Sequence, residues 1–190
     1  MNHGLCVAVM GPDGAGKSRL VAGLRTTYPR PITVLKMSAA MRAPIRGPAG
    51  VRWFVRTMRS VRALVGARFD LLRGRVVVWD RHPLEDRAMA VEGWFVLGHG
   101  RSWLTRLAPR PHVVVILDAP TAVLAERRPE HAPAQLDRFR GIYRALAREH
   151  QAILVDASRP AHEVRDEVVE RLRQFEADGP LPEDSHHADA

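Results

Sequence analysis

Eight residues near the start of the chain, GPDGAGKS at positions 11–18, match the pattern G-x-x-x-x-G-K-[S/T]. Glycines at these spacings let the backbone turn several N–H groups inward on one phosphate group. A helix beginning at Lys17 would point its N-terminus at the same place, which also favours an anion. In this pattern Lys17 brings positive charge to the β- and γ-phosphates, and Ser18 offers a hydroxyl to Mg²⁺. The spacing therefore predicts a nucleoside triphosphate site, with a purely structural Gly-rich turn as the alternative.

The residues predicted to contact the nucleotide are Gly11, Asp13, Gly14, Ala15, Gly16, Lys17, Ser18 and Arg19. Two classes of nucleotide-binding protein are disfavoured by the rest of the chain. A GTPase would need an Asn-Lys-x-Asp motif, whereas the only asparagine is Asn2. The Leu-Ser-Gly-Gly-Gln signature of transporter ATPases is also absent from the sequence. The loop thus predicts nucleotide binding without specifying a reaction.

Strands and helices that alternate along the chain must position this loop. Short apolar runs predict five strands, at 5–10, 33–36, 76–79, 113–117 and 153–155. Helical patterns are found at 17–28, 51–73, 84–107, 121–127, 134–150 and 161–175. Gly66 is a candidate kink or break in the second of these helices. The alternation predicts an α/β fold of three layers, with a roughly five-stranded parallel sheet flanked by helices.

Positive charge is concentrated in one segment of the chain. The 190 residues include 29 Lys and Arg against 21 Asp and Glu, a net charge of +8, and 27 of the 29 basic residues are arginine. Segment 42–75 holds nine arginines and one acid, so the remaining sequence is neutral. Three interpretations stay open: arginines that bind an anionic acceptor, a basic helix on a membrane or nucleic acid, or a solvated face. In the last case the apolar positions from 51 to 72 pack on the sheet or on a second copy.

Other features of the sequence narrow the class of protein. No apolar run approaches the roughly 20 residues that a membrane span needs. The N-terminus lacks the basic region of a signal peptide. A single cysteine, Cys6, excludes an internal disulfide framework and is expected in the core. These features predict a soluble cytoplasmic protein, for which binding to nucleic acid or membrane is disfavoured.

Several segments resemble thymidylate kinases, in the order in which that family has them. The loop GPDGAGKS has the family's Asp at its third position, and VVVWDRH at 76–82 resembles its strand followed by Asp-Arg. VVVILDAPTAVLAERR at 113–128 resembles the fourth strand and the helix that enters the lid. QLDRFRGIYRALA at 135–147 and ILVDASRPAHEV at 153–164 resemble the helix after the lid and the last strand with its adenine-side loop. The resemblance covers most of residues 5–175.

The resemblance implies a P-loop kinase fold and roles for individual residues. Lys17 and the loop amides would hold ATP, while Ser18 and Asp80 would lie near Mg²⁺. Arg81 would hold the acceptor's phosphate or position the reacting groups, and Asp13 would approach the acceptor's sugar. The family takes a catalytic arginine from the loop or from the lid, and the loop position is Gly14 in this chain. The lid candidates are Arg127 and Arg128, with Arg138 and Arg140 behind them, and Ser158 to Pro160 would lie near adenine.

The acceptor side departs from the family pattern. The family's Arg-Glu-Pro-Gly-Gly segment is replaced by KMSAAMRAPIRG at 36–47, and its Ser-x-Ala-Tyr-Gln segment by PLEDRAMAVEG at 83–93. The pattern ERRPE also resembles thymidylate kinase-like proteins that are encoded with bacterial polysaccharide or specialised-metabolite genes. The first hypothesis is thus an ATP- and Mg²⁺-dependent kinase that phosphorylates a nucleoside monophosphate or a related small, anionic acceptor. The alternatives are a kinase of a hydroxyl on a nucleoside, sugar or metabolite, and a non-catalytic ATP-binding module that acts through segment 42–75.

The resemblance also predicts how the chain is divided. Residues 1–175 would form a single P-loop kinase domain, with an acceptor-side insertion at about 37–75 and a lid at about 127–140. The acidic end, 176–190, would be a disordered tail, and a homodimer is possible through the apolar positions of 51–72. Two further residues have structural interpretations. Asp118 is expected to cap the helix that begins at 121, and His82 is expected in the wall of a pocket.

Overall fold

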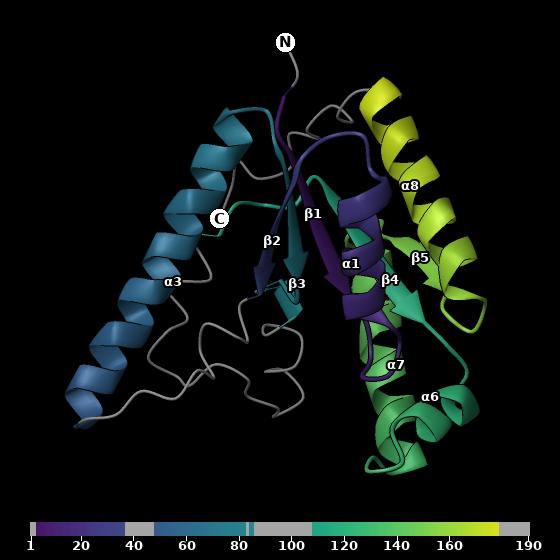
Figure 1. The fold of residues 1–190 in the computed structure, drawn as a ribbon. Helices are drawn as coiled ribbons and strands as arrows, with labels where there is room; N and C mark the ends of the chain where they lie inside the picture. Colours follow the sequence, from purple (N-terminus) through teal and green to yellow (C-terminus); the bar gives the residue numbers. More distant parts are fainter. Residues whose placement is uncertain (1–2, 37–47, 83, 86–107, 179–190) are drawn as a thin grey trace, which may run out of the picture.

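Five parallel strands form the centre of the molecule in this computed structural model, which describes residues 3–36, 48–82, 84–85 and 108–178 (Figure 1). The strands are β1 (Leu5–Met10), β2 (Ile32–Lys36), β3 (Val76–Asp80), β4 (Val113–Asp118) and β5 (Ile153–Asp156). They pair in the order β2-β3-β1-β4-β5, and every neighbouring pair is parallel. The sheet predicted from the apolar runs is therefore confirmed.

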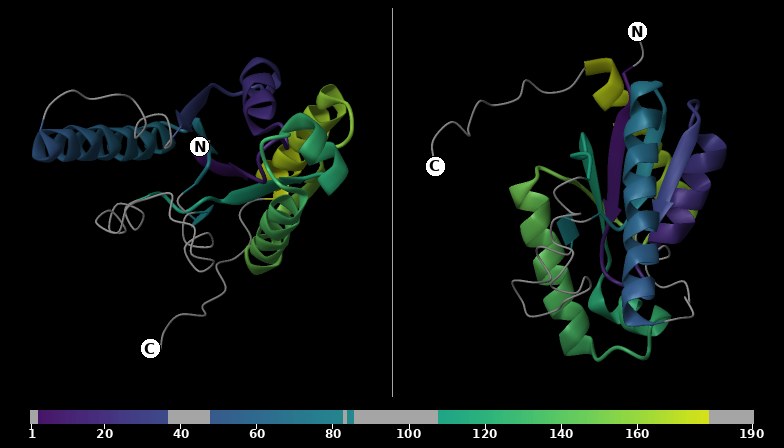
Figure 2. Two further views of the ribbon diagram at one scale, coloured as in Figure 1. Left: turned by 90° about the horizontal axis from the view of Figure 1, so that it is seen from below. Right: turned by 90° about the vertical axis from the view of Figure 1, so that its left-hand side faces the viewer.

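Helices cover both faces of this sheet. The described helices are α1 (Lys17–Thr27), α3 (Ala49–Leu72), α6 (Thr121–Arg127), α7 (Pro133–Glu149) and α8 (Ala161–Asp178). α1 and α8 pack together on one face, whereas α7 packs on β4 and α3 on β2 and β3 at the other face (Figure 2). The three-layer α/β architecture of a P-loop fold is thus present, as the sequence predicts.

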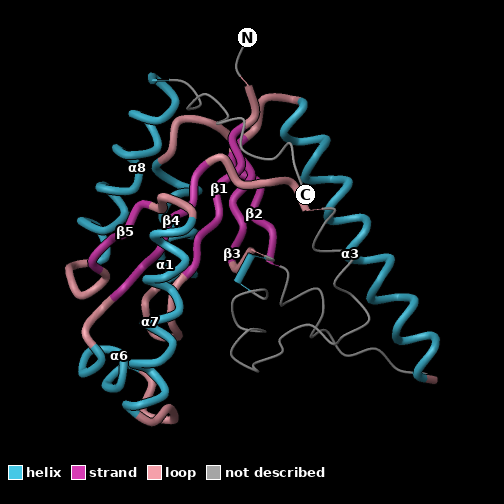
Figure 3. Tube along the Cα trace, turned by 180° about the vertical axis from the view of Figure 1, so that it is seen from behind, coloured by secondary structure: helices cyan, strands magenta, loops and turns pink. Residues whose placement is uncertain are grey.

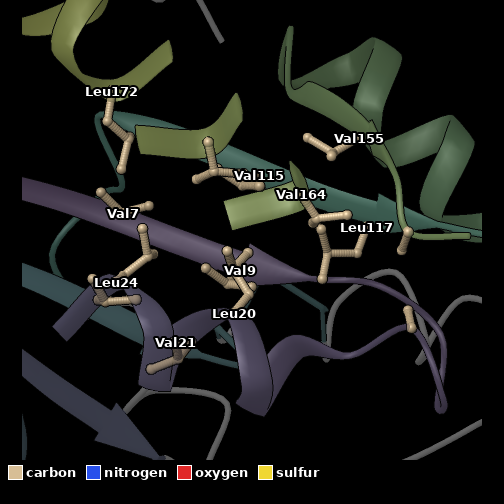
Figure 4. Packing of buried hydrophobic residues seen from close by; sticks show 14 of the residues in the cluster. Val7, Val9, Leu20, Val21, Leu24, Val115, Leu117, Val155, Val164 and Leu172 are labelled. Carbon is tan, nitrogen blue, oxygen red and sulfur yellow. The ribbon is translucent and has the colours of Figure 1, made fainter. Parts of the chain in front are cut away.

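Side-chain alternation along β1 shows why the strand is apolar throughout. Val7 and Val9 pack into the cluster formed with α1 and α8, where Leu24 and Leu172 are fully buried (Figure 4). The alternate residues Ala8 and Met10 belong to the cluster on the α7 side. A strand buried on both faces cannot place polar residues at either set of positions, which explains the continuous apolar run.

Helix α3 buries a different face from the one that the sequence pattern predicts. The positions expected to form its packing stripe are largely exposed, including Phe54, Val65 and Leu72, whereas Leu64 and Ala67 pack against β3. Figures 1 and 3 show that the helix diverges from the sheet towards its N-terminal end. The interpretation that the apolar stripe packs on the sheet is therefore wrong. The helical period identified a stripe, but period alone does not say which face meets the sheet.

Gly66 neither kinks nor divides α3, which is continuous from Ala49 to Leu72. A Cβ placed on Gly66 would meet no atom within 4 Å. Glycine in an open helix interior costs about 0.5–1 kcal/mol relative to alanine, because it has more backbone freedom to lose on folding. We therefore expect Gly66→Ala to raise the free energy of unfolding by about 0.5–1 kcal/mol in urea denaturation. A destabilised variant would show that the helix is distorted at this residue.

The remaining element boundaries agree with the sequence predictions to within three residues. The largest difference is the end of α8, which reaches Asp178 instead of residue 175, so residues 176–178 belong to this helix and not to the disordered tail expected at 176–190. The helix expected at 84–107 lies almost wholly outside the described residues. Cys6 is buried in the core, as expected. Among the helices that the structure describes, none is long and apolar enough to cross a membrane.

Candidate active site

The loop between β1 and α1 lies at the carboxyl end of the sheet, where ligands of open α/β sheets bind. Gly11 has φ 141°, and a Cβ there would lie 2.3 Å from the Leu117 carbonyl oxygen of the neighbouring strand. Gly14 has φ 89°, which residues with a side chain rarely adopt. Gly16 caps α1 without a side-chain hydrogen bond, and the first turn of α1 holds no acid. The N–H groups at this helix end are therefore left to bind an anion.

Lys17 is folded back onto the loop. Its ammonium donates hydrogen bonds to the carbonyl oxygens of Gly11 (2.6 Å) and Pro12 (2.8 Å) and lies 3.6 Å from an Asp13 carboxylate oxygen. The side chain is buried, and burial, followed by the nearby Arg81 charge, lowers the pKa of Lys17. A buried ammonium whose partners are mostly neutral carbonyls is well placed to gain from an incoming phosphate.

A cleft of about 600 Å³ opens over this loop. Its lining comes from the loop, the ends of β2 and β3, the end of α6 and the segment that follows β5. Seven of the described residues that line it are basic (Lys17, Arg19, Lys36, Arg81, Arg127, Arg128 and Arg159) and two are acidic (Asp13 and Asp80). All the predicted loop residues from Asp13 to Arg19 contribute to the wall, whereas Gly11 is not part of the lining. A cleft with this charge suits polyanionic ligands.

Ser18 and Asp80 both line the cleft and contact each other. The Ser18 hydroxyl donates a hydrogen bond to Asp80 Oδ2 at 3.2 Å, and the Lys36 ammonium lies 3.5 Å from the same carboxylate oxygen. Asp80 is buried at the end of β3, directly beside β1. A hydroxyl and a carboxylate oxygen at this separation are the hard oxygen donors that Mg²⁺ prefers, so the residues present fit that ion. One carboxylate suffices where phosphates and waters complete the coordination shell.

Arg81 connects the loop to a buried acidic network. Its guanidinium contacts the Asp13 carboxylate and donates to Glu85 Oε1 at 3.1 Å, while the Tyr143 hydroxyl contacts the same Glu85 oxygen. Burial alone would raise the pKa of Asp13, but Arg81 and Lys17 hold it below its ordinary value. Burial raises the pKa of Glu85 in spite of Arg81. Arg81 adopts φ 71°, a strained conformation of the kind that clusters at functional sites.

The end of α6 closes over the loop at Gly14. A Cβ on Gly14 would lie 3.1 Å from Arg128 Cγ and 3.5 Å from Arg127 Cβ, so the two arginines occupy the space beside this loop position. Arg127 donates to the carbonyl oxygens of Gly14 (3.3 Å) and Ala157 (3.0 Å), whereas Arg128 pairs with exposed Glu130. Both candidates for the lid arginine therefore lie at the cleft, and Arg127 is the more constrained of the two.

Asp118 does not cap α6, contrary to the sequence expectation. α6 has no side-chain cap at its N-terminus, and Asp118 instead pairs with Arg140 (2.8 Å) and Arg144 (2.7 Å) of α7. Burial would raise the pKa of Asp118, but these two arginines hold it below its ordinary value. Arg140 was a further candidate for the lid arginine. Its guanidinium instead donates hydrogen bonds to the Asp118 carboxylate and to the Thr121 hydroxyl. Asp118 thus anchors α7 to the end of β4.

The segment after β5 borders the cleft together with the end of α6. Ala157, Arg159 and Ala161 line the cleft, whereas Ser158 donates through its hydroxyl and its backbone N–H to the Asp156 carboxylate. Arg159 is held by Glu167 of α8. The expected adenine-side residues, 158–160, are therefore beside the cleft. His82 is buried against Trp79 and contacts the Pro109 carbonyl oxygen, and it is not among the residues that line the cleft.

The sequence interpretation missed three residues that the fold brings to the site. Lys36 reaches Asp80 from the end of β2, and Glu85 and Tyr143 hold Arg81 from two distant elements. One signal was available for Lys36, since it is one of only two lysines in the chain. Segments 37–47 and 86–107, which include most of the positions where the sequence departs from the family pattern, lie outside the described residues.

Comparison with known proteins matches most of the chain. A probable thymidylate kinase of Pyrobaculum calidifontis is 28% identical over 193 residues, which covers 86% of this chain and 93% of that protein. A probable thymidylate kinase of Pyrobaculum aerophilum is 27% identical over 195 residues, which covers 88% of this chain and 96% of that protein. No family model matches the chain. The chain is therefore similar, over most of its length, to proteins named probable thymidylate kinases, as its motifs predict.

Proposed function

We propose that this protein is an ATP-dependent phosphotransferase of the thymidylate kinase-like type. It moves the γ-phosphoryl group of ATP to a nucleoside monophosphate or a related small acceptor. The observation that carries the proposal is the convergence of Lys17, the Ser18–Asp80 pair and Arg81 in one strongly basic cleft. The similarity to proteins named probable thymidylate kinases supports a nucleotide kinase function independently of that geometry.

The donor, ATP, binds between the loop after β1 and the segment after β5. The loop amides and Lys17 bind the ATP phosphates, and the segment at 157–161 borders the adenine. Ser18 and Asp80 hold Mg²⁺, which neutralises charge on the phosphates when it is bound. Because phosphoryl transfer depends mostly on positioning and charge stabilisation, these residues need only hold the donor in line with the acceptor.

The acceptor side is assigned to Arg81 and Asp13. Arg81 binds an anionic group on the acceptor, and the Glu85–Tyr143 pair orients its guanidinium. A phosphate acceptor needs no general base, whereas a hydroxyl acceptor would use Asp80 to accept the proton. None of the described residues of α3 lines the cleft, so the described arginines of segment 42–75 are not the acceptor's partners in this arrangement.

A lid arginine stabilises charge on the transferring phosphoryl group. Arg128 is the better candidate, because its side chain is about half exposed and its ion pair among the described residues is with exposed Glu130, whereas two carbonyl oxygens hold Arg127. We expect Arg128→Ala to lower kcat by about 10²–10³-fold, with a much smaller change in the KM for ATP. Arg127→Ala should mainly raise the KM for ATP. Steady-state kinetics of the two variants would contradict the assignment if their effects were exchanged.

We propose the predicted organisation along with the activity. One kinase domain extends to the end of α8 at Asp178, with an acceptor-side insertion at about 37–75 and a lid at about 127–140. Location in the cytoplasm fits the substrates of such a kinase.

An ADP-release screen tests the proposed function. Purified protein with ATP and Mg²⁺ is offered nucleoside monophosphates, nucleosides, sugars and sugar phosphates separately. We expect ADP release that depends on an acceptor and is strongest with a nucleoside monophosphate. Release that requires a nucleoside or a sugar would favour the hydroxyl kinase instead. ATP binding without acceptor-dependent release from any compound, together with salt-sensitive binding to nucleic acid or vesicles, would favour a binding module.

A further inference from the structure

A second cavity, of about 540 Å³, lies at the amino-terminal end of the sheet, away from the active-site cleft. Its described lining comes from the starts of β4 and β5, the segments just before them, and single residues after β3 and near the end of α8. No described residue lines both cavities, so the two are separate. Small-molecule sites usually have volumes of about 300–1,000 Å³, so this cavity is large enough to hold a ligand.

Part of the lining of this second cavity is apolar. Leu84, Ile153 and Phe175 reach it from three separate segments of the chain. All three side chains pack against the core and yet remain only partly buried. A ligand with an apolar body would cover this remaining surface, and removing apolar surface from water favours binding. The lining therefore suits a ligand that is apolar over part of its own surface.

The polar part of the lining suits an anion. The described residues that line the cavity include one arginine, Arg110, and two histidines, His112 and His150, but no acid. Arg110 is exposed, and an exposed guanidinium can pair with a carboxylate through two parallel hydrogen bonds. The carbonyl oxygens at the end of α7 would disfavour an anion. Those of residues 146–148, however, already accept backbone N–H groups from residues 150–152.

The ring of His112 has a fixed tautomer. The backbone N–H of Cys6 donates to His112 Nδ1, and the backbone N–H of His112 donates to the Cys6 carbonyl oxygen, both at 2.8 Å. Because Nδ1 accepts a hydrogen bond, the proton of the neutral ring is on Nε2. Burial lowers the pKa of His112, which favours this neutral form. No described residue accepts a hydrogen bond from Nε2, so this N–H is left for a ligand.

We propose that this cavity binds a small organic anion whose acidic group is joined to an apolar body. Arg110 and the Nε2–H of His112 hold the acidic group, while the apolar body lies against Ile153 and Phe175. The proposal goes beyond the proposed kinase activity and does not depend on it, because no described residue of the cleft takes part. The protein would thus bind a small molecule in addition to its two substrates.

Backbone amide shifts of the ¹⁵N-labelled full chain test this site directly. The cleft is first filled with a non-hydrolysable ATP analogue and Mg²⁺, and 2-naphthoate is then added as the probe. We expect saturable shifts centred on residues 112–114 and 150–153, with a Kd of about 1 mM for a ligand of this size. Neutral 2-naphthamide has the same rings without the charge and should bind about tenfold more weakly. Equal affinity for the two compounds, or the largest shifts in the cleft or on α3, would overturn the proposal.

Two arginine variants provide a matched comparison, at about 0.15 M salt to screen long-range charge. Arg110→Gln should weaken the binding of 2-naphthoate about tenfold, the loss of one charge-assisted hydrogen bond, and leave that of 2-naphthamide unchanged. Exposed Arg148 lies close in sequence to His150 but does not line the cavity, so Arg148→Gln should keep both affinities. Unchanged binding of 2-naphthoate to the Arg110 variant, or an equal loss in the two variants, would contradict the proposal.

Discussion

Replacement of Lys17 by methionine is expected to lower kcat/KM for phosphoryl transfer by at least about 10³-fold. Methionine keeps most of the apolar stem and removes only the charge that would contact the β- and γ-phosphates. The Lys17 side chain is buried and belongs to the lining of the cleft. Initial rates of ADP release at saturating acceptor would measure the loss.

The control for this variant separates chemistry from folding. Lys17 donates to the carbonyl oxygens of Gly11 and Pro12, so its loss removes two hydrogen bonds from the loop. Each such bond contributes about 1 kcal/mol, which thermal unfolding of the variant would register as a modest decrease in Tm. A folded Lys17→Met protein that retained a tenth of the wild-type activity would show that the loop does not hold the phosphates.

Replacement of Asp80 by asparagine is expected to lower kcat by at least about 10²-fold. Asparagine has nearly the same shape but lacks the negative charge that faces Ser18 and Lys36. The variant should also require more Mg²⁺ for half-maximal activity, because the donor set loses its carboxylate. Titration of activity against Mg²⁺ concentration would measure both effects.

Asp118→Asn is a matched control for the Asp80 variant. Asp118 ends the strand on the other side of β1, as Asp80 ends β3, and it is equally buried. Its partners are Arg140 and Arg144 of α7, and it does not line the cleft. We expect this control to lose about 1–3 kcal/mol of stability and to keep kcat within about threefold of wild type. If the two variants lost kcat equally, Asp80 would have no catalytic role that Asp118 lacks, and its assignment to the site would be wrong.

The parts of the fold that depend on local pattern were predictable from the sequence. The three central strands were found because a strand buried on both faces must be apolar at nearly every position, as in Val7 to Met10 of β1. The loop was found because phosphate binding fixes the spacing of its glycines and of Lys17. Both signals lie within a short stretch of sequence, so no knowledge of tertiary packing was needed.

Features that depend on distant partners were not predictable in the same way. Asp118 resembled a helix cap because its true partners, Arg140 and Arg144, lie more than 20 residues away on α7. The buried Glu85 gains its role only when Arg81 and Tyr143 are brought to it. Helix α3 shows the same limit, because its apolar period could not tell that Leu64 faces the sheet while Phe54 faces outward.

The destination of the γ-phosphoryl group tests the central claim most directly. ATP labelled with ³²P in its γ-position is incubated with the protein, Mg²⁺ and the acceptor found by ADP release, and the products are separated. We predict that the label appears in the phosphorylated acceptor in amounts equal to the ADP formed, and that Lys17→Met abolishes both. Label found only in inorganic phosphate, whether or not an acceptor is present, would contradict the account.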